Sequence, residues 1–240
     1  VQTDFLQPTL VALSIAFVDY LKANGARPTI VAGHSLGELA ALYAAEVLDL
    51  EATLRLGIER GRLMAASATG GMLAVKDLAI ESIEKVLSEC QDGIVVAANY
   101  NSPLQLVISG EFAALNSVAS KLIAIGGTCV QLNVQGAWHS PLVANAAKAF
   151  CETIDQVTFR APQCKLVMGM TAEFEENPDR IRELLKTQIC SPVRWFSVVR
   201  KIASTGISHY IEVGPGKVLR GLMRKILDDA SSYEFVGVDN

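Results

Sequence analysis

The chain has 240 residues, of which 50% are hydrophobic, and a formal net charge of -4. A chain of this length can bury a sizeable core in one large unit, or in a large and a small one, while the acidic balance offers no basic footprint for nucleic acid. The five cysteines are odd in number and show no Cys-x-x-Cys spacing. They argue against a disulfide framework and a zinc site, and they favour a reducing cytoplasm.

The first predicted element is a buried helix from Thr9 to Ala23. Pro8 suits the first turn of this helix, and Gly25 suits its end. The apolar stretch within the helix, from Leu10 to Val18, is too short to span a bilayer. We therefore expect no membrane-spanning segment.

The next segment, Gly33-His34-Ser35-Leu36-Gly37, fits the pattern Gly-x-Ser-x-Gly. Residues 29–32 before it read as a short buried strand and residues 39–45 after it are rich in helix formers, so Ser35 lies at a sharp strand-to-helix turn. The flanking glycines relieve crowding in such a turn, and the Leu36 N–H at the helix N-terminus can stabilise an oxyanion. The pattern predicts a nucleophile elbow and acyl transfer through an acyl-serine.

A serine nucleophile needs a base, and the chain has three histidines. His34 precedes the serine on the same turn, where neighbouring side chains point apart, so we expect it to support the elbow. His209 alternates with apolar residues, which indicates a partnered core histidine. His139 lies in a loop with helix-start signals, where scaffolds present catalytic groups, and it is our candidate base. The alternative is a surface histidine that caps the next helix.

The middle of the chain alternates strands and helices in a different order. The predicted elements are a strand at 71–75, a helix at 79–89, strands at 94–99 and 105–109, a helix at 111–125 and a strand at 129–134. This βαββαβ order is typical of a ferredoxin-like unit.

Five short motifs together carry a resemblance over nearly the whole chain. They are GHSLGE (33–38), ERGRLM (59–64), NYNSP (99–103), WHSP (138–141) and EVGPGKVL (212–219). In this order and at this spacing, the motifs resemble those of the malonyl-CoA:acyl carrier protein transacylase family. The resemblance implies an α/β fold: an α/β-hydrolase-like large subdomain with a parallel sheet, formed by residues 1–70 and 135–240, and an inserted ferredoxin-like small subdomain of residues 71–134.

The resemblance also implies roles for four residues. Ser35 carries the malonyl group and His139 is its general acid and base, as the residues themselves indicate. The family orients this histidine through a main-chain carbonyl, here that of Gln188, so no acidic third member is required. Arg60 is implied to bind the free carboxylate of the malonyl group, a role that suits a planar guanidinium. Without the resemblance, we would assign Arg60 to a solvated, charged helix face.

The remaining candidates for substrate binding are Leu36, Asn101, Met64 and His34. Leu36 occupies a position tied to the choice of acyl group in the wider family. Asn101 matches a family asparagine near the pocket, although Asn-Ser-Pro is also an ordinary turn signal. Met64 either lines the pocket or packs in the core.

The resemblance implies malonyl-CoA and an acyl carrier protein as substrate and partner, with no cofactor, and we expect a cytoplasmic monomer. An acidic carrier protein requires a local basic patch. Four candidates follow the Gly-Pro-Gly loop: Lys217, Arg220, Arg224 and Lys225. The alternative interpretation is a cationic helix C-terminus.

The start of the chain departs from the family. Family members carry a longer N-terminal segment with a first strand and a Pro-Gly-Gln-Gly loop, whose glutamine supplies a second oxyanion N–H. We expect a chain without this segment to lack a strand and, unless another polypeptide supplies it, to react about 100- to 1000-fold more slowly.

Other functions stay open from the sequence. A serine acyl hydrolase would leave Arg60 without a partner, and a non-catalytic docking module is suggested only by the start of the chain. A polyketide synthase acyltransferase that uses another extender unit is hard to separate from a stand-alone fatty-acid enzyme, although malonyl is favoured over methylmalonyl.

Overall fold

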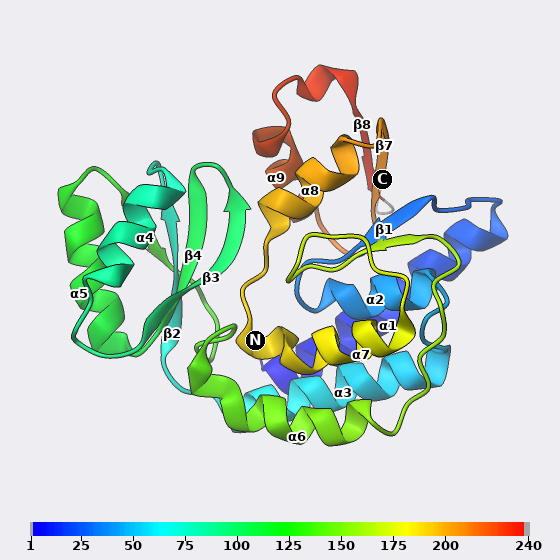
Figure 1. Cartoon of the computed structure of the whole chain (residues 1–240), viewed down its shortest axis with the longest axis horizontal. Coiled ribbons are helices and arrows are strands. Elements are labelled where there is room, and N and C mark those ends of the chain that lie inside the picture. The colour runs from blue at the N-terminus through cyan, green and yellow to red at the C-terminus, as the bar shows by residue number, and fades with distance from the viewer. Residues whose placement is uncertain (1, 238–240) are drawn as a thin grey trace.

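The computed structural model describes residues 2–237, which form a mixed α/β molecule with two unequal parts (Figure 1). The smaller part holds one antiparallel sheet and the helices α4 (Ile80–Ser88) and α5 (Phe112–Ala124). The larger part holds most of the helices and two short parallel sheets. Parallel sheets in one part and a separate antiparallel sheet in the other confirm the predicted fold class.

The antiparallel sheet has the strand order β3-β4-β2-β5. Its strands are β2 (Gly71–Lys76), β3 (Val95–Ser102), β4 (Gln105–Gly110) and β5 (Thr128–Gln131). With α4 after β2 and α5 after β4, this is the ferredoxin-like arrangement. Successive residues of β2 face opposite sides of the sheet. Leu73 and Val75 pack beneath the two helices, whereas Met72 and Ala74 join the core of the larger part. The subdomain boundaries at 70/71 and 134/135 stay a prediction.

The parallel strands of the larger part form two separate pairs. β1 (Ile30–Ala32) pairs with β6 (Lys165–Val167), and β7 (His209–Glu212) pairs with β8 (Glu234–Gly237). A cavity of about 730 Å³ lies between β1 and β7, and residues of both strands line it. Among the strands that the structure describes, no ladder joins one pair to the other.

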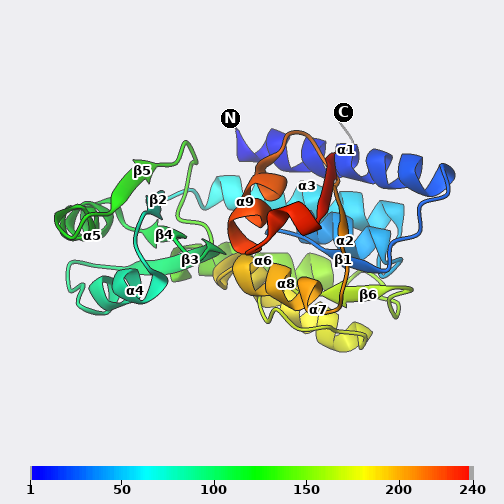
Figure 2. The ribbon, with the colours of Figure 1, turned by 90° about the horizontal axis from the view of Figure 1, so that it is seen from above.

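Five helices of the larger part enclose its main core. They are α1 (Thr3–Ala23), α2 (Gly37–Ala44), α3 (Leu50–Ala66), α6 (Ala144–Ile154) and α7 (Pro178–Thr187). Helices α1 and α3 run side by side (Figure 2). Two glycines of α3 permit this close packing: a Cβ on Gly57 would lie 3.0 Å from Val11, and one on Gly61 would lie 3.1 Å from the Thr3 carbonyl oxygen.

The first helix corrects two expectations. It begins at Thr3 rather than Thr9, so Pro8 lies inside the helix and not in its first turn. Because α1 is 21 residues long, its length and composition would allow it to cross a membrane, and the argument from the shorter apolar stretch is wrong. The core helix of a globular protein passes the same test. Here one face of α1, which includes Val11 and Ile15, is buried in the core.

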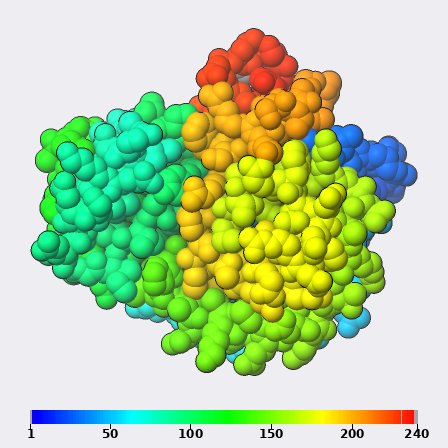
Figure 3. All heavy atoms as spheres, in the orientation of Figure 1, coloured from blue at the N-terminus to red at the C-terminus, as the bar shows by residue number. Residues whose placement is uncertain are grey.

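A segment before α8 (Trp195–Ala203) ties the two parts together. The Tyr100 N–H of β3 donates to the Val193 carbonyl oxygen at 2.9 Å, and the Val193 N–H donates to that of Ala98 at 2.8 Å. In Figure 3 this segment, in gold, lies at the surface between the green smaller part and the yellow residues of the larger part. The remaining short elements are η1 (Pro141–Val143), η2 (Gln188–Cys190), α9 (Val218–Ile226) and η3 (Ala230–Ser232).

Candidate active site

Ser35 occupies the turn between β1 and α2, as the Gly-x-Ser-x-Gly pattern predicts. Its φ of 52° is in the left-handed region, a costly conformation for a residue with a side chain and one that is common at nucleophile elbows. A Cβ on Gly33 would lie 2.2 Å from the Glu38 nitrogen, so only glycine fits there. A Cβ on Gly37 would meet nothing within 4 Å. The expectation that both glycines relieve crowding is therefore right for Gly33 and wrong for Gly37.

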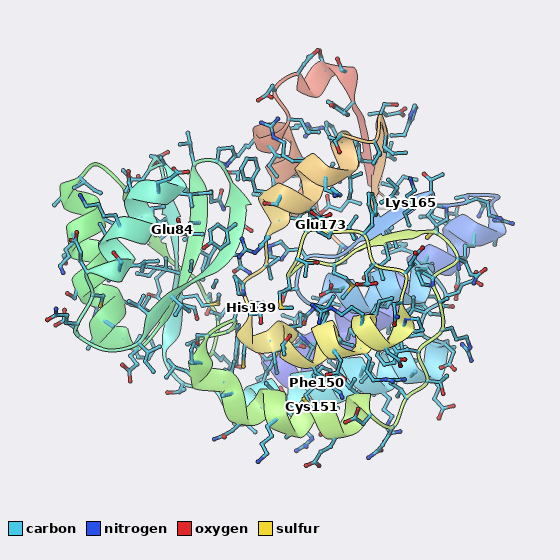
Figure 4. The ribbon with its side chains drawn as sticks, viewed as in Figure 1. Glu84, His139, Phe150, Cys151, Lys165 and Glu173 are labelled. Carbon is cyan, nitrogen blue, oxygen red and sulfur yellow. The ribbon has the colours of Figure 1, made fainter. Side chains whose placement is uncertain are left out.

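The structure brings His139 to Ser35, although 104 residues separate them. His139 lies where the two parts meet (Figure 4), with 4% of its surface exposed. Its Nε2 is 2.7 Å from the Ser35 Oγ. Its Nδ1 lies 3.1 Å from the carbonyl oxygen of Gln188 and 2.9 Å from that of Ser191. Since both carbonyls can only accept, Nδ1 carries the proton, and Nε2 is left to accept the proton of the serine hydroxyl.

The surroundings of His139 keep its imidazole neutral. Burial is the largest cause, and with the positive charge of Arg60 and the neighbouring His34 it lowers the pKa of His139 to about 3, against the opposing effect of the two carbonyl contacts. The side chain is therefore in its basic form across the physiological range. The alternative of an exposed, helix-capping histidine is wrong.

Arg60 is 1% exposed and reaches the nucleophile from α3. Its Nη2 donates to the Ser35 Oγ at 3.1 Å and to the Gln188 Oε1 at 3.2 Å, and its Nη1 donates to the Gln7 Oε1 at 2.7 Å. The solvated helix face predicted from the charge run fits Arg62, which is exposed and bonded to Glu59, but it is wrong for Arg60.

The guanidinium of Arg60 has donors to spare. Its Nε is buried and has no hydrogen-bond partner within the part of the chain that the structure describes. Burial lowers the pKa of Arg60 to about 10, partly offset by the negative charge of Glu38, so the group stays cationic at neutral pH. Nε and Nη2 form one edge of the guanidinium, a fork that matches the two oxygens of a carboxylate.

Gln188 lies at the centre of the hydrogen-bond network. Its side-chain Nε2 donates to the Ser35 carbonyl oxygen at 2.8 Å and to the Glu38 Oε2, while its Oε1 accepts from Arg60. From the sequence, Gln188 is a candidate substrate-binding residue whose main-chain carbonyl orients His139, but the partners of its side chain, Glu38 among them, and the role of Gln7 were missed. The signals were present, because Gln7 is a polar residue in an apolar helix and Glu38 follows the elbow directly.

His34 and Asn101 meet beside the elbow. The His34 Nε2 and the Asn101 Oδ1 are 2.9 Å apart, and the ring of His34 packs edge-on against Trp195 at 5.6 Å between centroids. Burial lowers the pKa of His34. Because Asn101 belongs to β3, this bond anchors the smaller part to the nucleophile turn, and Asn101 does not extend freely into a pocket.

Leu36 and Met64 differ in what they offer the site. The Leu36 N–H makes no hydrogen bond among residues 2–237 and stands at the start of α2, which suits an oxyanion donor. Met64 is 2% exposed and its sulfur accepts from the Gln7 Nε2 at 3.2 Å, as expected of a core methionine.

Two predictions for the C-terminal region are wrong. His209 is exposed and contacts Glu234 at 2.9 Å, because its face of β7 lies outside the core. Arg220 is 7% exposed and bonds to Glu212, so it does not belong to an exposed basic patch. The side chains of Lys217, Arg224 and Lys225 are exposed.

Comparisons with known proteins agree with this geometry. The family model described as "Acyl transferase domain" matches residues 1–239. A protein of Escherichia coli K12 named malonyl CoA-acyl carrier protein transacylase is 37% identical in an alignment 228 residues long that covers 92% of this chain and 74% of that protein. The crystal structure of MCAT from Streptococcus pneumoniae is 36% identical with a TM-score of 0.93, over 99% of this chain and 78% of that one. A malonyl-transacylase solved in complex with a type II PKS acyl-carrier protein is 33% identical with a TM-score of 0.94, over 100% and 78%.

Proposed function

The chain belongs to the acyl transferase domain family, and we propose that it moves a malonyl group from malonyl-CoA to the phosphopantetheine thiol of an acyl carrier protein. One observation carries the proposal. The Ser35 Oγ lies 2.7 Å from a neutral imidazole and 3.1 Å from a buried guanidinium whose Nε has no hydrogen-bond partner in residues 2–237. A nucleophile and a carboxylate-binding group are thus held side by side.

The first half-reaction forms an acyl-serine. The His139 Nε2 accepts the hydroxyl proton as the Ser35 Oγ bonds to the thioester carbonyl carbon. The Leu36 N–H can donate to the oxyanion that forms. When the carbon–sulfur bond breaks, the thiolate of CoA takes the proton from His139 and leaves as the free thiol. The second half-reaction is the reverse, with the carrier thiol as the nucleophile.

The two carbonyl groups that face the His139 Nδ1 take the role that a carboxylate has in a Ser-His-Asp triad. They fix the tautomer and the ring plane while Nε2 gains a proton, and they stabilise the imidazolium by dipoles rather than by a full charge. In the described residues, no carboxylate contacts the ring of His139. The serine carries the acyl group and the histidine carries the proton in both half-reactions, so the proposal includes no cofactor.

Arg60 gives the site its preference for a malonyl group. A plain acyl chain would leave the Nε of this buried cation without a partner, whereas the free carboxylate of malonyl can pair with Nε and Nη2 together. The same argument counts against a general acyl hydrolase. The proposal extends to a cytoplasmic location, which the five free thiols fit, and to a monomer in solution.

The test is intact-protein mass spectrometry after brief incubation with malonyl-CoA. We expect a malonyl adduct on the wild-type chain, none on Ser35→Ala, and little adduct from acetyl-CoA. Addition of holo-acyl carrier protein should discharge the adduct much faster than buffer alone. An adduct that buffer discharges equally fast would favour a hydrolase, and equal acetyl and malonyl labelling would contradict the role of Arg60. Light scattering would measure the oligomeric state.

A further inference from the structure

Glu38 is a buried carboxylate that the proposed chemistry does not use. It is the second residue of α2 and is 1% exposed. Its Oε1 accepts from the Gly169 N–H at 3.0 Å, and its Oε2 accepts from the Gln188 Nε2. A buried carboxylate is costly unless hydrogen bonds compensate it, so a group of this kind beside the nucleophile calls for an explanation.

Glu38 and the Ser35 carbonyl oxygen together fix which way the amide of Gln188 points. The Nε2 of the amide donates to the Glu38 Oε2 and to the Ser35 carbonyl oxygen, which can only accept, and therefore the NH₂ end of the amide faces both oxygens. The oxygen end is then turned to Arg60, where it accepts from Nη2 at 3.2 Å. With the amide reversed, oxygen would face carboxylate and NH₂ would face guanidinium, and both contacts would be repulsive.

We propose that Glu38 is a positioning residue that acts through Gln188 to hold the guanidinium of Arg60 beside Ser35. This inference rests on the proposed malonyl transfer and adds a residue to its specificity machinery. Burial raises the pKa of Glu38, and the hydrogen bonds from Gly169 and Gln188 and the positive charge of Arg60 oppose this effect. A negative charge on Glu38 in turn helps to keep Arg60 cationic.

The relay explains why the carboxylate does not touch the arginine. A direct ion pair would occupy the guanidinium and compete with the carboxylate of the substrate. With Gln188 between them, Glu38 supplies orientation and charge while the Arg60 Nε stays unpartnered among the described residues. The guanidinium is therefore held in place by bonds to Nη2, while its Nε donor is left open.

The test begins with Glu38→Gln, which keeps the size of the side chain but leaves one acceptor oxygen. The NH₂ group of the new glutamine then points either at the Gly169 N–H, a donor against a donor, or at the NH₂ group of Gln188. In the second case the amide of Gln188 must turn over, which brings its NH₂ group against the guanidinium of Arg60. We expect the rate of malonyl-adduct formation to fall about 10- to 100-fold, the range for one lost bond to a charged group. The acetyl rate should change little, because acetyl has no carboxylate for Arg60. The control is Glu59→Gln, a carboxylate next to Arg60 in sequence whose hydrogen bonds, in the described part of the chain, go to Arg62.

A double-mutant cycle separates positioning from a general structural role. Gln188→Met removes the relay, and so the variant with both Glu38→Gln and Gln188→Met should be no slower with malonyl-CoA than Gln188→Met alone. If the loss of malonylation rate in the double variant equals the product of the losses in the two single variants, the proposal is overturned. A Glu38→Gln chain that keeps its preference for malonyl-CoA over acetyl-CoA would overturn it too. Circular dichroism checks folding. If Glu38→Gln does not fold, a folded Gln188→Met chain with unchanged malonyl preference also overturns the proposal.

Failure of this inference is distinct from failure of the proposed function. A wild-type chain that forms no malonyl adduct contradicts the malonyl transfer itself. A wild-type chain that forms the adduct, with no effect of Glu38→Gln on its malonyl preference, contradicts only the positioning role.

Discussion

Replacement of Arg60 by alanine should change the acyl preference of the site. The substitution removes the donor fork next to Ser35 and leaves the carboxylate of a bound malonyl group without a cation. Breaking a buried, hydrogen-bonded charge pair costs about 3 to 5 kcal/mol. At about 1.4 kcal/mol for each tenfold change, malonylation should slow roughly 100- to 4000-fold. Acetylation should change far less, since it gains nothing from the fork.

The same substitution should move the pH dependence of the reaction. The charge of Arg60 is the second cause, after burial, of the lowered pKa of His139. Without that charge the pKa of His139 should rise from about 3 toward its ordinary value of 6.5. Because His139 must be neutral to accept the serine proton, the acidic limb of the rate profile should move to higher pH.

The assay is the rate of adduct formation with malonyl-CoA and with acetyl-CoA, followed by mass spectrometry across the acidic pH range. Arg62→Ala is the matched control, because this neighbour is exposed and, among the residues that the structure describes, bonds to Glu59 alone. Arg60→Lys should fall between wild type and alanine, since an ammonium keeps the charge but not the fork. Equal slowing with both thioesters, or an unchanged pH limb, would refute the reasoning.

Three further predictions concern stability. His139 has a pKa of about 3 in the folded chain against 6.5 unfolded, so the unfolded state binds the proton first as the pH falls. The free energy of unfolding should therefore decrease as the pH falls from 6.5 to about 3. Urea titrations at several pH values should show a smaller decrease for His139→Gln. Gly33→Ala should destabilise the chain severely, because its Cβ would lie 2.2 Å from a backbone nitrogen, whereas Gly37→Ala, with open space, should keep nearly the wild-type melting temperature. Asn101→Ala removes the hydrogen bond to the partly buried ring of His34 and should cost about 1 to 3 kcal/mol in denaturant unfolding. A loss below the error of the measurement would contradict an anchoring bond.

The sequence by itself determined the elements whose signals are local. The turn around Ser35 needs a strand, a glycine and a helix in immediate succession, and all three are read from adjacent residues. The βαββαβ unit follows from hydrophobic periodicity within short windows, and each of its predicted elements corresponds to one between Gly71 and Gln131. His139 could be chosen because the chain has so few histidines.

The tertiary structure alone decided the environment of single charged residues. Arg60 and Arg62 belong to the same charge run, yet only Arg60 is buried, because the glycines of α3 let α1 pack over that side of the helix. The alternating pattern around His209 predicted a core position, but the face of β7 that carries this residue lies outside the core.

The network through Gln188 also depends on the tertiary fold. Its amide reaches Glu38 across 150 residues and Arg60 across 128, while its main chain faces the imidazole of His139. Periodicity and turn signals extend over only a few residues, whereas burial and hydrogen-bond partners depend on which helices pack together. Local chemistry was therefore determined by the sequence, and the charge and orientation of the site by the packing of α1, α2 and α3 around it.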